Sequence, residues 1–363
     1  MKSPKNKPTL KQLRNLTDPP SLSEGARQKV RSLRKKTPST QELIKGILEG
    51  NKTALAQAIT LVESTNPDHS QQANDIIDQC LSHSTQSIRI GITGVPGVGK
   101  SSFIESFGGH LISLGKKLAV LAVDPSSSIS KGSILGDKTR MQELVKNPDV
   151  FIRPSPSGTS IGGVARKTRE SIILCEAASY EVILIETVGV GQSETAVHGM
   201  VDFFLLLQLA GAGDELQGIK RGIVEMADAI VINKADGDNI KRAQLAKGEY
   251  QRALHLYPPK ENGWVPQVLD CSSIESRGIK EIWELLDRYF TETRRSGHFQ
   301  ENRRVQNRYW FLQTVEDLLK LRFYGDRKVQ KQLKKWEGRV MDHEISPFRA
   351  AAKLLEFQQK ELK

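Results

Sequence analysis

The chain has 363 residues, of which 38% are hydrophobic and 26% are charged, a composition typical of soluble globular proteins. No run of about 18 apolar residues occurs, so no transmembrane helix is expected, and the basic N-terminus lacks the apolar core of a secretory signal. The three cysteines, Cys80, Cys175 and Cys271, are widely spaced and form no CxxC pair. This pattern predicts reduced thiols in a cytosol-like compartment and excludes a disulfide scaffold or a cysteine zinc site.

The net charge of +11 is concentrated at the two ends of the chain. Residues 1–36 carry a net charge of +9 and residues 294–363 carry +8, whereas residues 37–293 carry −6. A protein that reads nucleic acid usually concentrates basic residues on a folded domain that also carries a binding motif. The sequence shows no such module, so we interpret the basic ends as solvated tail and helix surface, and nucleic-acid binding is disfavoured.

The N-terminal part of the chain divides into two regions. Residues 1–37 are rich in Lys, Pro and Ser, which predicts a disordered extension. A helical region is expected over residues 38–85, where Ser39-Thr40-Gln41-Glu42 has the pattern of a capping box and Gly50 is placed to end the first helix. The helical patterns that follow are Ala54–Val62 and Asp75–Leu81.

Short apolar runs rich in β-branched residues alternate with helical stretches over residues 86–293, and this alternation predicts the fold class. Continuous apolar strands need a sheet that is covered on both faces. We therefore expect an α/β P-loop NTPase fold, with a mostly parallel, doubly wound sheet, helices on both faces and a ligand site beyond the carboxyl ends of the strands. The expected strands are Ile88–Thr93, Leu118–Val123, Val182–Glu186, Phe203–Leu209, Ala229–Asn233 and Gln267–Asp270, with Val150–Ile152 as a weaker candidate.

Residues 294–363 are expected to form a C-terminal helical region. Trp310–Phe323 has the pattern of one helix, and Ser346-Pro347 supplies an N-cap and a first-turn proline for another. These helices are too few to form a core of their own. We expect them to pack on the main domain or on a partner subunit.

A phosphate-binding loop follows the first expected strand directly. Its sequence, GVPGVGKS, fits GxxxxGK[ST], in which backbone N–H groups surround the phosphates, the lysine contacts the β- and γ-phosphates and the serine hydroxyl binds Mg²⁺. Ser102–Leu114 is expected to form the helix whose N-terminus supports the anion. The residues expected to bind the nucleotide here are Gly94, Val95, Pro96, Gly97, Val98, Gly99, Lys100, Ser101 and Ser102.

A second motif, Asn233-Lys234-Ala235-Asp236, ends the strand Ala229–Asn233 and predicts guanine recognition. The Asp236 carboxylate can accept hydrogen bonds from both N1–H and the 2-amino group of guanine, whereas adenine would leave it unpaired. The Lys234 stem can lie over the base, and Asn233 is expected to tie loops together. The backbone of a third segment is expected to contact the guanine carbonyl; its residues are Ser272, Ser273 and Ile274.

Three carboxylates are expected to face the same crevice and to complete a magnesium site with Ser101, because Mg²⁺ prefers oxygen ligands. These are Asp124, Asp137 and Glu186. Gly189 is placed to let a backbone N–H meet the γ-phosphate, and Gln192 is a candidate for positioning the attacking water. The candidate catalytic residues are thus Lys100, Asp124, Glu186 and Gln192.

Together these motifs resemble the signal-recognition-particle-type (SIMIBI) class of P-loop GTPases and, more closely, the methylmalonyl-CoA mutase-associated GTPase family, which includes bacterial MeaB/ArgK and the human cobalamin A protein. The resemblance covers about residues 39–363. The stretches that carry it are GVPGVGKSS (94–102), VDPSSSISKGSILGDKTRM (123–141), IETVGVGQSE (185–194), LQLAGAGDELQGIK (207–220) and VINKADGDN (231–239).

This resemblance implies a homodimeric GTPase that uses GTP and Mg²⁺ and acts as a chaperone for an adenosylcobalamin-dependent acyl-CoA mutase of the methylmalonyl-CoA mutase type. The chaperone would gate cofactor loading and protect the mutase. Residues 294–363 would provide the dimerisation arm. The partner-sensing switch would contain Asp214, Gln217 and Lys220. We expect slow intrinsic hydrolysis that the partner accelerates.

Three other functions remain open. An amino-acid transport kinase would use ATP, against which the Asn-Lys-Ala-Asp motif argues. A nickel-insertion GTPase of the same class would need clustered His and Cys ligands, which the sequence lacks. A nucleic-acid binder would use the basic ends and show a steep salt dependence. The Lys- and Pro-rich N-terminus differs from an Arg-rich transit peptide, so we favour the bacterial cytoplasm over the mitochondrial matrix.

Overall fold

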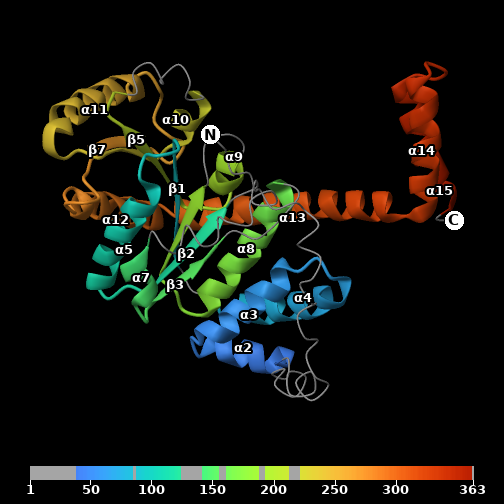
Figure 1. Cartoon of the computed structure of the whole chain (residues 1–363), viewed down its shortest axis with the longest axis horizontal. Helices are drawn as coiled ribbons and strands as arrows, with labels where there is room; N and C mark the ends of the chain where they lie inside the picture. The colour runs from blue at the N-terminus through green and yellow to red at the C-terminus, as the bar shows by residue number, and fades with distance from the viewer. Residues whose placement is uncertain are drawn as a thin grey trace, which may run out of the picture. The chain divides into compact units, whose positions relative to one another are not determined.

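The computed structural model describes residues 38–84, 87–123, 141–154, 161–187, 193–211 and 221–361. From Thr40 onward these residues belong to one compact unit, Thr40–Lys363. Its centre is a seven-stranded sheet in the order β3-β2-β4-β1-β5-β6-β7 (Figure 1). All six strand pairings are parallel, which confirms the predicted doubly wound α/β fold. The strands are β1 (Ile88–Gly94), β2 (Leu118–Val123), β3 (Val150–Arg153), β4 (Val182–Thr187), β5 (Phe203–Leu209), β6 (Ala229–Asn233) and β7 (Gln267–Asp270).

The sheet is apolar on both faces because helices cover both of them. Alternate residues of the central strands point to two separate clusters of buried side chains, as expected for buried parallel strands. The helices on one face are α8 (Ile161–Ala177), α9 (Ser193–His198), α10 (Arg221–Met226) and α11 (Ile240–Leu254); those on the other are α5 (Lys100–Ser113), α7 (Gln142–Lys146) and α12 (Ile279–Arg295). A short 3₁₀ turn, η1 (Gly237–Asn239), precedes α11.

Three N-terminal helices pack against α8 and share its core. They are α2 (Thr40–Leu48), α3 (Lys52–Glu63) and α4 (Pro67–Leu81). Asn51 caps α3 by accepting from the backbone N–H groups of Thr53 and Ala54, and Asn66 caps α4, whose first residue is a proline. Asn66-Pro67 is a start signal present in the sequence, so α4 begins eight residues before the predicted Asp75.

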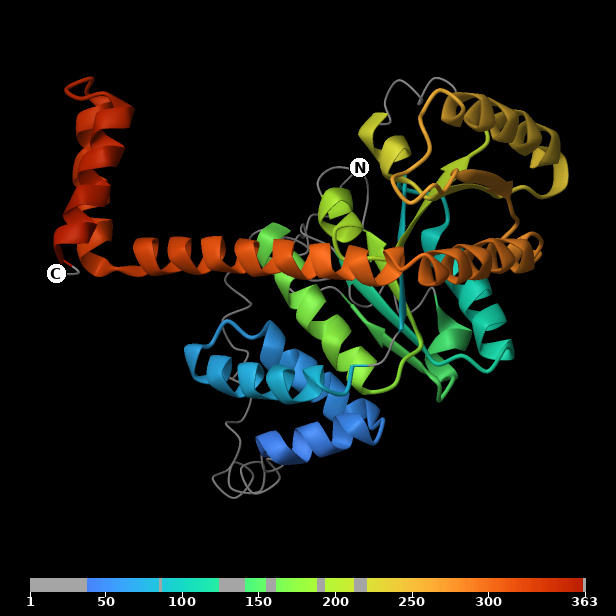
Figure 2. The same cartoon turned by 180° about the vertical axis from the view of Figure 1, so that it is seen from behind.

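The C-terminal region contains three helices: α13 (His298–Gly325), α14 (Arg327–Met341) and α15 (Pro347–Glu361). The predicted Trp310–Phe323 segment lies within α13, which is twice as long, and α14 was not predicted. Ser346 caps α15 as expected, since its Oγ accepts from Arg349 N–H at 3.3 Å. Figures 1 and 2 show α13 passing the sheet, with α14 and α15 packed on each other near its far end.

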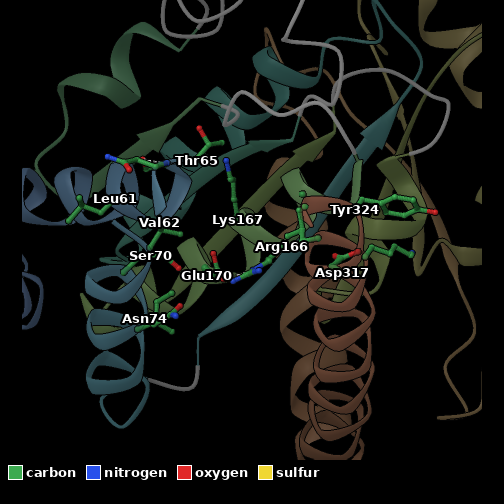
Figure 3. A pocket seen from close by; sticks show the side chains of 18 residues that line it. Leu61, Val62, Thr65, Ser70, Asn74, Arg166, Lys167, Glu170, Asp317 and Tyr324 are labelled. Carbon is green, nitrogen blue, oxygen red and sulfur yellow. Dashed lines mark hydrogen bonds and ion pairs between the residues drawn. The ribbon is translucent and has the colours of Figure 1, made fainter. Parts of the chain in front are cut away.

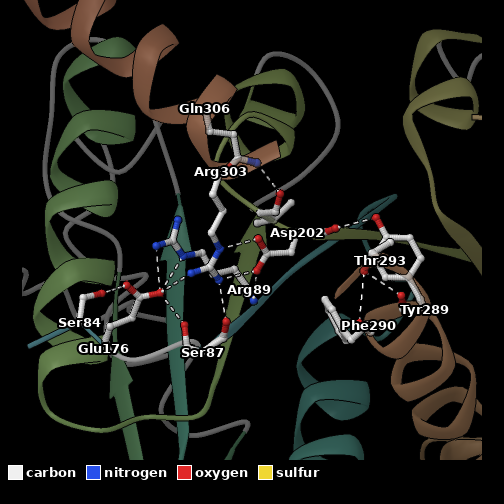
Figure 4. Close-up of polar contacts among 11 residues, drawn as sticks. Ser84, Ser87, Arg89, Glu176, Asp202, Tyr289, Phe290, Thr293, Arg303 and Gln306 are labelled. Carbon is white, nitrogen blue, oxygen red and sulfur yellow. Dashed lines mark hydrogen bonds and ion pairs between the residues drawn. The ribbon is translucent and has the colours of Figure 1, made fainter. Parts of the chain in front are cut away.

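A buried ion-pair network attaches the first half of α13 to the sheet (Figure 4). The Arg303 guanidinium donates to both carboxylate oxygens of Asp202, at 2.9 and 2.8 Å, and to the carbonyl oxygen of Ser87 at 2.6 Å. Arg303 and Arg89 both pair with Glu176, whose side chain is 1% exposed. Two cations therefore compensate two buried carboxylates, which desolvation would otherwise make costly.

We predict that Arg303→Met lowers the free energy of unfolding by about 3 kcal/mol, because it removes one partner from a buried set of charges. Urea or thermal unfolding of the full chain measures this loss. The matched control is Arg304→Met, since the neighbouring Arg304 side chain is 80% exposed and belongs to a surface pair; we expect a change within about 0.5 kcal/mol. Equal losses in the two variants would contradict a structural role for the network.

Candidate functional site

The predicted phosphate loop lies at the centre of the sheet. It leaves β1, which pairs with β4 on one side and β5 on the other, and it leads into α5 at Lys100. The Lys100 ammonium donates to the carbonyl oxygens of Gly94 at 2.8 Å and Val95 at 3.3 Å. The side chain thus lies folded over the loop, where phosphate oxygens could replace the two carbonyl oxygens as its acceptors.

Gly99 brings the phosphate loop against the predicted base-reading loop. Its φ of +93° lies in the left-handed region, and a Cβ atom there would meet the Asn233 amide nitrogen at 2.9 Å. A side chain at this position would therefore be strained and would push the two loops apart. The glycine lets the N-terminus of α5 and the end of β6 approach each other closely.

Asn233 joins three loops at the carboxyl edge of the sheet. Its amide nitrogen donates to the carbonyl oxygen of Val98 at 2.9 Å, and its amide oxygen accepts from the Ser273 hydroxyl at 2.8 Å. The residue is 1% exposed, so its hydrogen bonds are shielded from water. This geometry confirms the prediction that Asn233 ties loops together.

The backbone of the base-reading loop is held in an unusual conformation. Lys234 has a φ of +59°, which is uncommon for a residue other than glycine and costs about 1 kcal/mol or more. Asn239 donates to the carbonyl oxygen of Lys234 at 2.7 Å, and the N–H of Ala235 donates to the carbonyl oxygen of Cys271 at 2.9 Å. Strain that is stabilised by surrounding contacts is typical of functional loops.

Asp236 follows this strained turn, and Ser272 orients its carboxylate. The Ser272 hydroxyl donates to Asp236 Oδ2 at 2.7 Å. A carboxylate can accept several hydrogen bonds at once, so Asp236 keeps acceptor capacity for a base that offers two adjacent N–H donors. The third predicted segment thus contacts the motif through its side chains. Ile274, the last residue of that segment, is 84% exposed.

One cation and two carboxylates lie close together at the phosphate loop. Burial lowers the pKa of Lys100, while the negative charges of Glu186 and Glu194 act in the opposite direction. A phosphate group would add further negative charge beside the partly desolvated ammonium. Glu186 lies on β4, paired in register with Ile92 of β1. Beyond it, the Thr187 hydroxyl donates to the Thr93 hydroxyl at 2.9 Å.

Two of the residues predicted to bind magnesium lie among the described residues. The Ser101 hydroxyl, at the first turn of α5, and the buried Glu186 carboxylate are both hard oxygen donors that suit Mg²⁺. Among the described residues, no group of three or more His, Cys, Asp or Glu side chains is arranged to hold a metal ion. A site that keeps waters and substrate phosphates as ligands needs no such group.

Several predicted site residues lie outside the described residues. They are Asp124, Asp137, Gly189, Gln192, Asp214, Gln217 and Lys220.

Sequence reasoning missed a polar cluster next to the base-reading loop. Arg277 donates to the carbonyl oxygen of Ala235 and pairs with Asp270 at 3.3 Å, and Lys247 pairs with the same carboxylate at 2.8 Å. The three charged residues come from β7, α11 and the loop before α12. No sequence spacing connects them. The available signal was a charged residue, Asp270, at the end of a strand that leads into the predicted Ser-Ser segment.

The chain is similar in sequence to several known proteins. A family model described as "Methylmalonyl Co-A mutase-associated GTPase MeaB" matches residues 55–328. A probable GTPase of Mycobacterium tuberculosis is 50% identical over 307 residues, which cover 85% of this chain and 91% of that protein. The mouse protein named "Methylmalonic aciduria type A homolog, mitochondrial" is 43% identical over 323 residues, covering 86% of this chain and 78% of that protein.

A solved structure is also similar. The crystal structure of a protein named "LAO/AO transport system kinase" has a TM-score of 0.70 and 39% sequence identity, and the match covers 88% of this chain and 97% of that one.

We predict that Asp236→Asn reverses the base preference of the site. An amide side chain can donate to the 2-carbonyl of xanthine but cannot accept both N–H donors of guanine, so affinity for GTP should fall by about 100-fold and affinity for xanthosine triphosphate should rise. Competition binding against a fluorescent nucleotide measures both. Asp238→Asn, two residues along, is the control and should leave the preference unchanged. An unaltered preference in Asp236→Asn would refute guanine recognition by this carboxylate.

Proposed function

We propose that this protein serves an adenosylcobalamin-dependent acyl-CoA mutase. The premise is that the chain belongs to the methylmalonyl-CoA mutase-associated GTPase family and hydrolyses GTP. In this role it gates cofactor loading and protects the mutase, using GTP hydrolysis as the switch. The observation that carries the guanine-nucleotide part of the proposal is the hydrogen bond from Asn233 to Val98. It couples the base-reading loop physically to the phosphate loop, so one nucleotide can engage both.

Different described residues would bind the phosphates and the base of the nucleotide. Lys100 would exchange its two carbonyl acceptors for oxygens of the β- and γ-phosphates. Asp236, held by Ser272, would accept from guanine. Phosphoryl transfer depends chiefly on positioning and charge neutralisation, because the protein contributes little covalent chemistry. The phosphate loop after β1 would supply the positioning, and Lys100 at its end would supply the positive charge.

Magnesium fits the oxygen donors of the site. Ser101 and Glu186 would hold the ion directly or through water, together with Asp124 and Asp137 from outside the described residues. When bound, Mg²⁺ would neutralise negative charge on the phosphate oxygens.

The residues that would connect hydrolysis to a partner lie outside the described ranges. Gln192 is proposed to position the attacking water, and Asp214, Gln217 and Lys220 are proposed to sense the mutase. No described residue is assigned as a general base. We therefore propose that hydrolysis by the chain alone is slow and that the partner accelerates it.

A second candidate function is that of an amino-acid transport kinase, because the similar crystal structure is of a protein named a transport system kinase. A kinase of that kind would transfer phosphate from ATP to another protein. The carboxylate of Asp236, oriented by Ser272, suits guanine and would be desolvated without a partner against adenine. We therefore favour the mutase chaperone, and direct competition of ATP against GTP for the site separates the two candidates.

The proposed location is the bacterial cytoplasm. The three cysteines are buried and unpaired, as expected in a reducing compartment. No described helix is long and apolar enough to cross a membrane. Recovery of the protein in a membrane or periplasmic fraction would contradict this location.

We predict that an adenosylcobalamin-dependent methylmalonyl-CoA mutase raises the single-turnover rate of GTP hydrolysis by about tenfold or more, because a docked partner can order the catalytic groups. Quenched-flow measurements with and without the mutase test this, and gel filtration with a non-hydrolysable GTP analogue or GDP tests complex formation. A Lys100→Ala variant is the control, since it should lose hydrolysis in both conditions. Equal rates and no complex in any nucleotide state would refute the mutase as partner.

The homodimer is proposed from the exposed apolar surface of α13. Phe311, Leu318 and Leu321 are 66%, 51% and 66% exposed. Leu321 and Tyr324 also line a groove of about 760 Å³ whose other walls are α3, α4 and α8 (Figure 3). Several exposed apolar side chains on one helix are typical of an interface. We propose that a second copy of the chain covers it.

We predict that the double substitution Leu318→Arg and Leu321→Arg shifts a dimer to monomers, because burying two charges without partners is unfavourable. Sedimentation velocity across a 100-fold range of concentrations measures the shift. Leu256→Arg is the matched control, since Leu256 lies on another surface and is 86% exposed. A wild-type chain that sediments as a monomer at every concentration would contradict the proposed dimer.

A further inference from the structure

The loop between β7 and α12 contains an arginine whose side chain reaches two separate elements. One terminal nitrogen of Arg277 donates to the carbonyl oxygen of Ala235, in the base-reading loop, and the other pairs with Asp270 Oδ2 at 3.3 Å. Asp270 is itself held from the opposite side by Lys247 of α11, at 2.8 Å. The guanidinium is thus fixed at both ends of its fork, which a planar group with several donors does well.

The backbone around Arg277 is closed into a tight turn, so the side chain starts from a fixed position. Ser272 and Arg277 exchange two backbone hydrogen bonds, at 3.0 and 3.1 Å. Gly278 follows with a φ of +79°, and a Cβ atom there would lie 2.4 Å from the carbonyl oxygen of Asp270. Only glycine allows the start of α12 to lie this close to the end of β7.

Ala235 is the point at which Arg277 acts on the base-reading motif. Its N–H donates to the carbonyl oxygen of Cys271 at 2.9 Å, and its carbonyl oxygen accepts from Arg277. That carbonyl belongs to the same planar peptide group as the N–H of Asp236. The guanidinium therefore fixes the plane from which the Asp236 side chain projects, while Ser272 fixes its carboxylate at the other end.

The charges around Asp270 keep the clamp, by which we mean Arg277 bound to both Asp270 and the carbonyl oxygen of Ala235, in place near neutral pH. Burial opposes ionisation of Asp270, but the hydrogen bonds and charges of Lys247 and Arg277 outweigh it and lower the pKa of this carboxyl group. Asp270 therefore stays charged as the acceptor for Arg277. The Asp270 side chain is 17% exposed and the Arg277 side chain is 43% exposed, so the carboxylate is partly shielded while the guanidinium still meets solvent.

We propose that Arg277 is a positioning residue for base recognition, which orients Asp236 through the carbonyl group of Ala235 and so sets the affinity and selectivity for guanine. This inference rests on the proposed guanine site and assigns a residue that lies outside the nucleotide-binding motifs. Arg277 touches neither the phosphate loop nor the phosphates in this assignment. Its loss should change base discrimination and leave the chemical step intact.

The test compares Arg277→Met and Arg277→Lys with the wild-type chain in affinity for GDP, IDP and ADP. IDP lacks the 2-amino group, so the ratio of IDP to GDP dissociation constants reports one of the two donors that Asp236 accepts. We expect Arg277→Met to weaken GDP binding by about tenfold and to lower this ratio by about threefold or more. Arg277→Lys should fall between, because lysine keeps the charge but loses the planar fork. The rate of hydrolysis at saturating GTP should change by less than about twofold.

Two controls make the outcomes distinguishable. Lys280→Met removes another cation from the start of α12, from an exposed pair with Glu284, and should change neither affinity nor ratio. Thermal unfolding of every variant separates a folding defect from a binding defect, and Asp270→Asn offers a second way to weaken the clamp if Arg277→Met does not fold. Equal losses for GDP and IDP, with the ratio unchanged, would overturn the positioning role. Failure of Asp236→Asn to change the base preference would instead refute the guanine site itself.

Discussion

The side chain of Asn233 is the contact on which the site depends. One amide group donates to the phosphate loop and accepts from the serine segment after β7, so three loops that are far apart in sequence share one buried hydrogen-bonding group. The contact requires Gly99 in a left-handed conformation, since a Cβ atom there would occupy the same space. The two ends of the proposed nucleotide site are in this way held at a fixed separation, so binding energy from the base could be used to hold the triphosphate.

The opposite edge of the sheet is stabilised by charges. At the amino edge of the sheet, Arg303 and Arg89 compensate the buried carboxylates of Asp202 and Glu176. Arg303 also fixes α13 to the chain segments that precede β1 and β5. An ion-pair network of this burial contributes less net stability than its contacts suggest, because all four groups lose hydration. It does define one position for α13. The exposed apolar surface of that helix is therefore presented in a fixed direction relative to the sheet.

The sequence predicted much of this arrangement from local chemistry. All seven strands were predicted within one residue at each end. The five inner strands are buried almost throughout and are therefore continuous apolar runs, whereas the edge strands β3 and β7 are only partly buried. The phosphate loop and the Asn-Lys-Ala-Asp motif were placed correctly at the ends of β1 and β6. The extent of α13 and the existence of α14 were not predicted. Most of α13 is exposed and its apolar residues show little helical period, so its full extent is not marked in the sequence. The helical period of α14 is clear, and that helix was missed although the sequence carried the signal.

What the sequence determined by itself was therefore the order and type of the elements in the sheet and the identity of the two nucleotide motifs, since each depends on neighbouring residues. Only the tertiary structure decided which groups orient those motifs. Arg277 reaches Ala235 across 42 positions and Asn233 reaches Val98 across 135. Arg303 reaches Ser87 across 216. Contacts at such separations arise from the way a parallel sheet brings strand ends together, and no local pattern of residues encodes them.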